Sequence, residues 1–403
     1  MPLLPSPVVK LDVFCELERG GVPWSREGEA QVIEDSLEQA RLADRLGYDT
    51  WWTVEHHGCG DFSLSSTPEL FNLMVAQQTS RIRIGHSGVL APFTINHPVR
   101  VAERAAFLDV ISNGRLEMGA ARAGHQELRN FGLDLDTMRQ NLRELMQMLP
   151  RMWNETDFSW DSDYVKIPEI NVVPKPLQRP HPPLWQMAIS RESFEMAGSL
   201  GVGVIGTTLL EPLESLSILR DLYRKGLQST ATHVSPVVHD EFGVFTFVHC
   251  AATKEEAIRN LAGPAVLWYV NGVPRALKTP RKVMIDSFRN TFSPGQTLAG
   301  LNAGDVVDDE QWDLDDPIPV IRLLNRQMAG LPVDPEEAFE VFEPMDAVVI
   351  GDPEMCFDKM AKFADIGVQR LLCFQQFGMI EQPAVLASME LLANEVMPKL
   401  AAL

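Results

Sequence analysis

The segment Glu55-His56-His57-Gly58 carries the side chains of this sequence that are best suited to proton transfer. An imidazole titrates near neutral pH, so it donates or accepts a proton where most side chains do neither. Adjacent histidines also suggest zinc, but consecutive residues of an extended segment point in opposite directions, and no H-x-x-x-H spacing or nearby His–carboxylate set completes a site. We therefore expect no metal here. An acid–base group and a structural, hydrogen-bonded pair remain as the two interpretations.

A second group of residues is suited to binding a phosphate. Arg122 follows a candidate strand, and the hydroxyls of Ser190 and Ser193 stand at the start of a helix that runs to Leu200. Hydroxyls and free backbone N–H groups at a helix N-terminus form a ready phosphate site. Helix capping alone would also explain the serines, and a surface charge would explain Arg122. Together with Arg139, these residues could hold one phosphate.

Helix-to-strand junctions recur along the chain and position both groups. At Gly47, Gly201 and Gly367 a helical stretch ends in Gly, the usual left-handed stop, and a β-branched or aromatic run follows. Strands that alternate with helices imply parallel pairing. The candidate helices include residues 29–46, 98–111, 137–153, 192–200 and 211–226, and the candidate strands are residues 8–14, 50–54, 82–90, 115–120, 183–189, 202–205, 242–249 and 368–374. Eight strands suit an α/β fold of the (β/α)8 TIM barrel type, with an open doubly wound sheet as the alternative.

The stretch between the seventh and eighth candidate strands is long and irregular. Residues 263–344 are richer in Pro, Gly and Asp than the rest, and we interpret their acidic section, residues 305–316, as a solvated loop. Barrel loops at the C-terminal ends of the strands surround the active site, so such an insertion is expected to be a lid. We interpret residues 1–403 as one domain that carries this insertion.

Composition excludes several classes of protein. The formal charge of −20 argues against a nucleic-acid partner, because that affinity comes largely from clustered Lys and Arg. The five cysteines are scattered, without a C-x-x-C pair, and indicate neither a disulfide framework nor a thiolate zinc site. No apolar run reaches the roughly 18 residues of a membrane span, and the N-terminus lacks a signal-peptide pattern. We expect a cytoplasmic protein without membrane association.

Three segments resemble the bacterial luciferase-like flavin-dependent monooxygenases. They are the motif EHHG, the run RIRIGHSGVLAPFTINHPVRVAERAAFLDVISNGRLEMGAAR, and the ending GDPEMCFDKMAKFADIGVQRLLCF. The resemblance is dense over residues 10–143, returns at 183–206 and 346–377, and is weak through the insertion. The helix that opens on His97-Pro98, with the L-D-x-x-S-x-G-R that follows it, is specific to that family, so the resemblance favours the closed barrel.

The resemblance also implies a site for FMN. His56 matches the active-site histidine that lies beside the isoalloxazine ring and assists proton transfer. Ser87-Gly88 matches a bulge that often carries a non-prolyl cis peptide beneath the flavin. The positions that hold the FMN phosphate match Arg122, Arg139, Ser190 and Ser193.

Two positions depart from the luciferase pattern. Luciferase has a reactive cysteine just before the arginine that matches Arg122, and here that residue is Ala121. An acidic residue near the phosphate is replaced by Ile189. We therefore expect a chain that does not emit light efficiently and that binds phosphate through the remaining donors.

By this resemblance the chain would be the oxygenase half of a two-component monooxygenase. A separate flavin reductase would supply reduced FMN, and dioxygen would supply the oxygen atom for a small organic substrate. The relatives are usually homodimers or larger. Three alternatives stay open: a deazaflavin-dependent oxidoreductase, a catalytically silent flavin-binding partner subunit, and a metal-dependent barrel hydrolase. Four tryptophans would line the substrate pocket or pack the core, namely Trp24, Trp51, Trp52 and Trp185.

Overall fold

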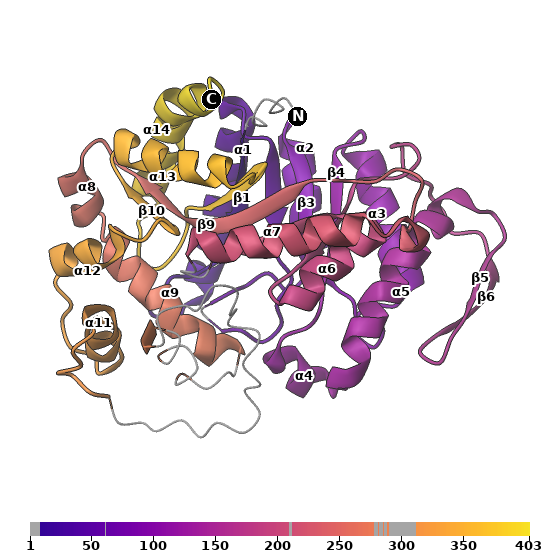
Figure 1. Cartoon of the computed structure of the whole chain (residues 1–403), viewed down its shortest axis with the longest axis horizontal. Coiled ribbons are helices and arrows are strands. Elements are labelled where there is room, and N and C mark those ends of the chain that lie inside the picture. The colour runs from indigo at the N-terminus through magenta and orange to yellow at the C-terminus, as the bar shows by residue number, and fades with distance from the viewer. Residues whose placement is uncertain are drawn as a thin grey trace.

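Eight parallel strands close into a barrel in the computed structural model, which describes residues 9–60, 62–208, 212–277, 281, 285, 288, 289 and 312–403. Neighbouring strands pair in the order β1-β2-β3-β4-β7-β8-β9-β11, and β11 pairs with β1 to close the ring. Figure 1 shows the barrel with β1, β3, β4 and β9 labelled. The strands are β1 (Lys10–Cys15), β2 (Thr50–Thr53), β3 (Arg83–Leu90), β4 (Leu116–Ala121), β7 (Leu184–Met187), β8 (Gly203–Thr207), β9 (Phe242–Cys250) and β11 (Arg370–Phe374). All eight strands expected from the sequence are barrel strands, and closure rules out the open sheet.

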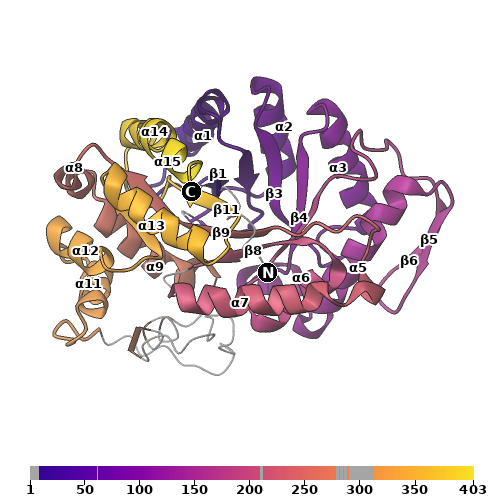
Figure 2. The same cartoon turned by 45° about the horizontal axis from the view of Figure 1, so that its top comes forward.

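Helices surround the barrel on its outside, as both orientations of the cartoon show (Figure 2). The first of them begins where the Ser25 side chain accepts a hydrogen bond from the Gly28 N–H, and it ends at Gly47, whose φ is 88°. These helices are α1 (Arg26–Leu46), α2 (Pro68–Gln78), α3 (Pro98–Ile111), α5 (Leu135–Asn154), α6 (Arg191–Leu200), α7 (Leu213–Leu227), α13 (Pro353–Asp365) and α14 (Gln382–Leu391). The five helices expected from the sequence are confirmed as α1, α3, α5, α6 and α7. Residues 209–211, which include the start of the expected helix 211–226, lie outside the described residues.

Several short elements of the structure have no counterpart in the sequence-based prediction. An antiparallel hairpin of β5 (Phe158–Asp161) and β6 (Lys166–Ile170) projects from one end of the molecule (Figure 1). A ninth parallel strand, β10 (Val348–Gly351), pairs with the C-terminal half of β9. The shorter helices are α4 (His125–Phe131), α8 (Lys254–Arg259) and α15 (Met397–Leu400), with a π-helical turn at Leu392–Val396 before α15.

The insertion is more regular than its composition indicates. It contains α9 (Ala262–Leu277), α11 (Pro319–Met328) and α12 (Pro335–Phe342), and α9 packs against both of the others. The prediction that the acidic section is a solvated loop is wrong for Asp316, which is fully buried, pairs with Arg289 and accepts a hydrogen bond from the Ile318 N–H. Most of that section lies outside the described residues.

The N-terminal end of the barrel interior is filled by charged groups and two tryptophans. Arg370 pairs with Asp12, Asp49 and Glu241. The indole N–H of Trp52 donates to Asp12 at 2.8 Å, and that of Trp185 donates to Glu117 at 2.7 Å. A cavity of about 300 Å³ opens beside this end, at the start of β7 and β8.

Three of the four tryptophans belong to the core, and the fourth lies on the surface. Trp51, Trp52 and Trp185 are fully buried and belong to the core. Trp24 is 62% exposed, and its indole donates to Glu29 on α1, so it neither packs the core nor lines a pocket. All five cysteines are buried, and none forms a disulfide bond among the described residues. Among the described residues, no helix has both the length and the apolar character that crossing a membrane requires.

Candidate active site

The residues predicted from the sequence gather at the C-terminal ends of the strands. Glu55-His56-His57 follows β2, Ser87-Gly88 lies in the C-terminal half of β3, Arg122 follows β4, and Ser190 opens the helix after β7. Because all barrel strands are parallel, these positions share one mouth. The tryptophan-filled end described above is the opposite one.

His56 is held by a fully buried carboxylate. Glu127 of α4 places its Oε1 atom 3.3 Å from Nδ1 of the imidazole and also accepts hydrogen bonds from the N–H groups of His57 and Gly124. Burial alone would lower the pKa of His56. The hydrogen bond to Glu127 and the charge of Glu16 outweigh burial, so the pKa lies above its ordinary value and the imidazolium form is favoured.

His57 has a different set of partners, which join the loops of the mouth. Its Nε2 lies 3.1 Å from Glu55 Oε1. The same carboxylate accepts hydrogen bonds from the Leu90 N–H at 2.9 Å and from the Asn96 side chain at 2.8 Å. Glu55 thereby ties the end of β2 to the end of β3 and to the segment before α3. This geometry suits the structural interpretation for His57 and leaves the acid–base interpretation to His56.

Glu16 is a site residue that the sequence analysis does not identify. It follows β1, is only 3% exposed, and places Oε2 3.9 Å from His56 Nε2. Its Oε1 accepts a hydrogen bond from the Tyr269 hydroxyl at 3.3 Å. Tyr269 belongs to α9, and its ring lies 4.9 Å from that of Phe62, which in turn lies 6.2 Å from the His56 ring. The one signal in the sequence is that an acidic residue follows a barrel strand.

The expectation that no His–carboxylate set lies near His56 is wrong. His56, Cys59 and Glu127 bring ligand atoms within 4.8 Å of one another, a spacing that could hold a metal ion. Glu127 escaped notice because it lies on α4, far along the chain from the histidines. In the structure each member has protein partners, since Glu127 accepts two backbone N–H groups and Cys59 contacts the carbonyl of Ala276.

Ser87-Gly88 is joined by a non-prolyl cis peptide bond, which is the conformation that the resemblance implies. The register between β3 and β4 shifts at this point, between His86 and Val89. A Cβ atom on Gly88 would lie 2.8 Å from the backbone nitrogen of Ala120, so the β3 backbone passes close against β4. The Ser87 hydroxyl donates to Met187 Sδ at 3.1 Å.

Arg122 and Arg139 approach each other near the start of α6. Burial and the charge of Arg139 both lower the pKa of Arg122, while Glu192 in the first turn of α6 acts in the opposite direction. Neither guanidinium forms a hydrogen bond in the part of the chain that the structure describes. Two neighbouring cations without protein acceptors suit an anionic ligand.

The two serines of this cluster are engaged in capping α6. Ser190 accepts from the Ser193 N–H, and the Ser193 hydroxyl donates to the Ser190 carbonyl at 2.6 Å while accepting from the Ile189 and Ser190 N–H groups. The structure therefore confirms that both serines cap α6. Their contact with a phosphate stays a prediction, and the N-terminus of α6 supplies the favourable dipole.

The chain belongs to the luciferase-like monooxygenase family, whose model matches residues 11–370. It is 32% identical over 204 residues to the oxygenase component of the flavin-dependent trigonelline monooxygenase of Acinetobacter baylyi. That match covers 50% of this chain and 55% of the relative, so the chain spans little more than half the length of that protein.

Solved structures share the fold. One is the oxygenating constituent of 3,6-diketocamphane monooxygenase of Pseudomonas putida in complex with FMN, with a TM-score of 0.69, 18% identity, and coverage of 97% of this chain and 99% of the other. Another is the coenzyme F420-dependent tetrahydromethanopterin reductase of Methanopyrus kandleri, with a TM-score of 0.65, 17% identity, and coverage of 98% and 99%. The architecture thus accompanies both FMN and a deazaflavin.

Proposed function

We propose that the chain is the oxygenase component of a two-component monooxygenase that uses reduced FMN and dioxygen to oxygenate a small organic substrate. A separate flavin reductase supplies the reduced FMN. The observation that carries this proposal is the pairing of two features at one mouth: an imidazole whose pKa is raised by its hydrogen bond to Glu127, and the adjacent guanidinium groups of Arg122 and Arg139 at the start of α6. The similarity to a flavin-dependent oxygenase component supports the same reaction class.

The arginine cluster favours FMN over a deazaflavin. The terminal phosphate of FMN is a monoester that carries up to two negative charges, and two guanidinium groups with a helix N-terminus match that charge. A deazaflavin coenzyme that carries its phosphate as a diester has only one negative charge there and needs fewer neighbouring cations. When bound, reduced FMN reacts with dioxygen and carries the oxygen atom that reaches the substrate.

The residues of the chain have separate tasks in this proposal. Arg122, Arg139 and the N-terminus of α6 would hold the FMN phosphate. His56 moves a proton at its Nε2 atom, because Glu127 fixes Nδ1. Phe62 packs edge-on against the imidazole, Tyr269 packs against Phe62, and the two rings cover one side of His56.

A stopped-flow experiment tests the cofactor and the reaction together. The protein is mixed anaerobically with reduced FMN, then with dioxygen, and the reoxidation of the flavin is followed beside free FMN. We expect bound FMN to reoxidise through a kinetically distinct phase that His56→Ala alters more than it weakens FMN binding. Consumption of a reduced deazaflavin, without FMN binding, would contradict the proposal, and FMN binding without any distinct phase would indicate a silent subunit.

We further propose a homodimer that forms through α2 and α3. These helices pack side by side, and their outer faces expose four large apolar side chains. They are Leu70, Met74, Phe107 and Val110. Grouped apolar side chains of this size on a protein surface commonly mark an interaction site.

A further inference from the structure

We propose that Glu16 returns a proton to His56 during turnover, and that Tyr269 holds Glu16 in position for this task. The inference rests on the proposed function, since it concerns the same imidazole. Glu16 acts through His56 and not on the substrate. No residue of this relay other than His56 is indicated by the resemblance to luciferase-like proteins.

Each ring nitrogen of His56 has its own buried carboxylate. Nδ1 lies 3.3 Å from Glu127, within hydrogen-bond distance, whereas Nε2 lies 3.9 Å from Glu16. The longer separation leaves Nε2 available to a reacting group. A small rotation of the ring or one intervening water molecule closes the gap to Glu16.

The environment of Glu16 makes this carboxylate easier to protonate than an exposed one. The side chain is 97% buried, and among the residues that the structure describes its Oε2 atom has no hydrogen-bond partner. Burial raises the pKa of Glu16, and the nearby charge of His56 only partly offsets this effect. Glu127 behaves in the opposite way, because the hydrogen bonds from His56 and His57 outweigh its burial and hold its pKa below the ordinary value. Of the two carboxylates that flank the imidazolium, Glu16 is therefore the one that takes up a proton more readily.

The proton moves through the relay in three steps that balance. His56 gives its Nε2 proton to the reacting oxygen atom and becomes neutral. Solvent then protonates the Glu16 carboxylate at Oε2, which is easier once the neighbouring positive charge of His56 is gone. Glu16 finally gives this proton to Nε2, so that the imidazolium and the carboxylate are both restored, and the net result is transfer of one proton from water to the reacting group.

Tyr269 connects this relay to the insertion. Its hydroxyl donates to Glu16 Oε1, which leaves Oε2 as the atom that exchanges the proton. The ring is buried and packs against those of Phe62, Phe247 and Phe374 at about 5 Å. In addition α9 packs beside α4, the helix that carries Glu127. The insertion thus contributes a fixed hydroxyl to the acid–base centre.

Imidazole NMR on the protein without FMN tests the relay independently of any flavin reaction. The histidines are labelled, the His56 signal is assigned with His56→Asn, and its titration is compared among variants. We expect Glu16→Gln to move the His56 titration to lower pH, because a negative charge that favours the imidazolium is removed. Tyr269→Phe should move it in the same direction by a smaller amount. A His56 titration that Glu16→Gln leaves unchanged would overturn the proposal.

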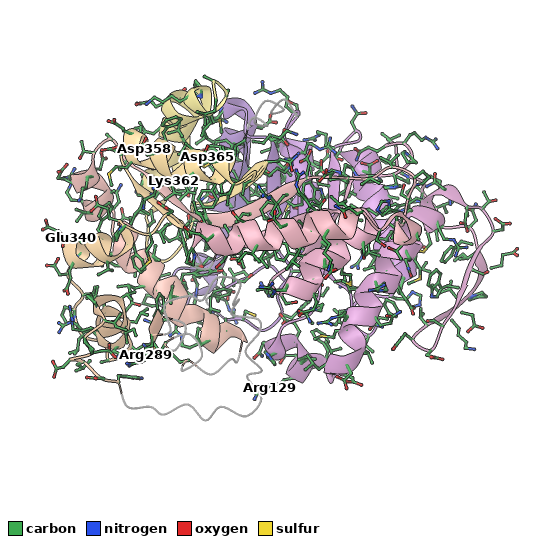
Figure 3. The ribbon with its side chains drawn as sticks, in the orientation of Figure 1. Arg129, Arg289, Glu340, Asp358, Lys362 and Asp365 are labelled. Carbon is green, nitrogen blue, oxygen red and sulfur yellow. The ribbon has the colours of Figure 1, made fainter. Side chains whose placement is uncertain are left out.

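A matched control keeps this result specific. Glu340 on α12 is an exposed carboxylate at the outer edge of the molecule, remote from the barrel mouth (Figure 3). Glu340→Gln removes the same charge from the protein as Glu16→Gln, and it should leave the His56 signal where it is. Thermal unfolding of each variant verifies that it is folded, and Glu16→Asp provides a second variant that retains the carboxyl group.

Kinetics with reduced FMN and dioxygen supply the functional readout. Glu16→Gln should slow flavin reoxidation at neutral pH by about tenfold, below the full effect expected for losing an acid–base group, with the FMN dissociation constant unchanged. Glu16→Asp should recover part of the rate. Equal losses of rate and FMN affinity would make Glu16 structural and overturn the proposal. If the wild-type protein shows no FMN-dependent reaction with dioxygen, the proposed function fails while the NMR comparison still decides the relay.

Discussion

Glu127 Oε1 lies 3.3 Å from His56 Nδ1 although 71 positions separate the two residues in the chain. The carboxylate is fully buried, accepts the backbone N–H groups of His57 and Gly124, and contacts Cys59 Sγ at 4.0 Å. This relationship fixes the orientation of the imidazole and stabilises its charged form. Through this contact the fold sets the orientation and the pKa of the side chain to which we assign proton transfer.

We predict that Glu127→Gln shifts the alkaline limb of the pH–rate profile to lower pH. The pKa of His56 is raised in the folded protein, so the imidazolium persists until the pH rises through that value and is lost above it. Removing the partner charge lowers that pKa and brings the loss to lower pH. The reoxidation rate of reduced FMN, measured across pH, reports the shift. Asp358→Asn on the exposed face of α13 is the control, and an equal shift in that variant would contradict the assignment.

We predict that Arg139→Gln weakens binding of reduced FMN by about tenfold or more, since hydrogen bonds to charged groups contribute roughly 1.5–3 kcal/mol. Riboflavin, which lacks the phosphate, should bind both proteins equally. Equilibrium titration under anaerobic conditions measures both ligands. The control is Arg129→Gln, because Arg129 is an exposed cation on α4 at the outer edge of the molecule (Figure 3). An equal loss for riboflavin would remove Arg139 from the phosphate site.

We predict that Gly88→Ala destabilises the protein by about 1–3 kcal/mol, the usual cost of overpacking. The added methyl group would lie within 2.9 Å of backbone atoms of Ala120, which cannot move without disturbing β4. Denaturant unfolding measures the change. Gly272→Ala in α9 is the control, because its nearest neighbour is a Phe62 ring atom at 3.4 Å, an ordinary contact. Similar losses of unfolding free energy in the two variants would show that the close approach of β3 to β4 does not cause the destabilisation.

We predict that Phe107→Lys converts a dimer into a monomer of unchanged fold. A charge on the exposed apolar face of α3 would have to be buried in the interface. Light scattering coupled to size exclusion measures the mass, and circular dichroism verifies the fold. Leu331→Lys, beyond the end of α11, places the same charge on another exposed apolar position and should leave the dimer intact. A wild-type protein that is already monomeric contradicts the dimer outright.

Much of the barrel could be predicted from local sequence signals. Gly47, Gly201 and Gly367 all have positive φ, and each stops a helix directly before a strand, so β2, β8 and β11 could be located from these junctions. The β5–β6 hairpin escaped because two successive strands interrupt the alternation of helix and strand, and β10 escaped because it is a ninth strand where a closed barrel needs only eight. The helices of the insertion escaped because its Pro, Gly and Asp content obscures them.

The site could be predicted only where one residue carries its own signal. His56 stands in a motif directly after a strand, and Arg122 stands at a strand end, so each is visible without the fold. Glu16 and Glu127 are acidic residues among many, and their role depends on which side chains the barrel brings beside them. Tyr269 reaches the site from the insertion, where the sequence resembles the family least. Such partners are defined by closure of the barrel and not by spacing along the chain.

A crystal structure of the protein with FMN is the measurement that tests the central claim most directly. Our account predicts the FMN phosphate at the N-terminus of α6, within hydrogen-bond distance of Arg122 and Arg139, and the isoalloxazine ring beside His56 Nε2 above Ser87-Gly88. A phosphate bound away from the two arginines, or a flavin ring that does not reach His56, would contradict it.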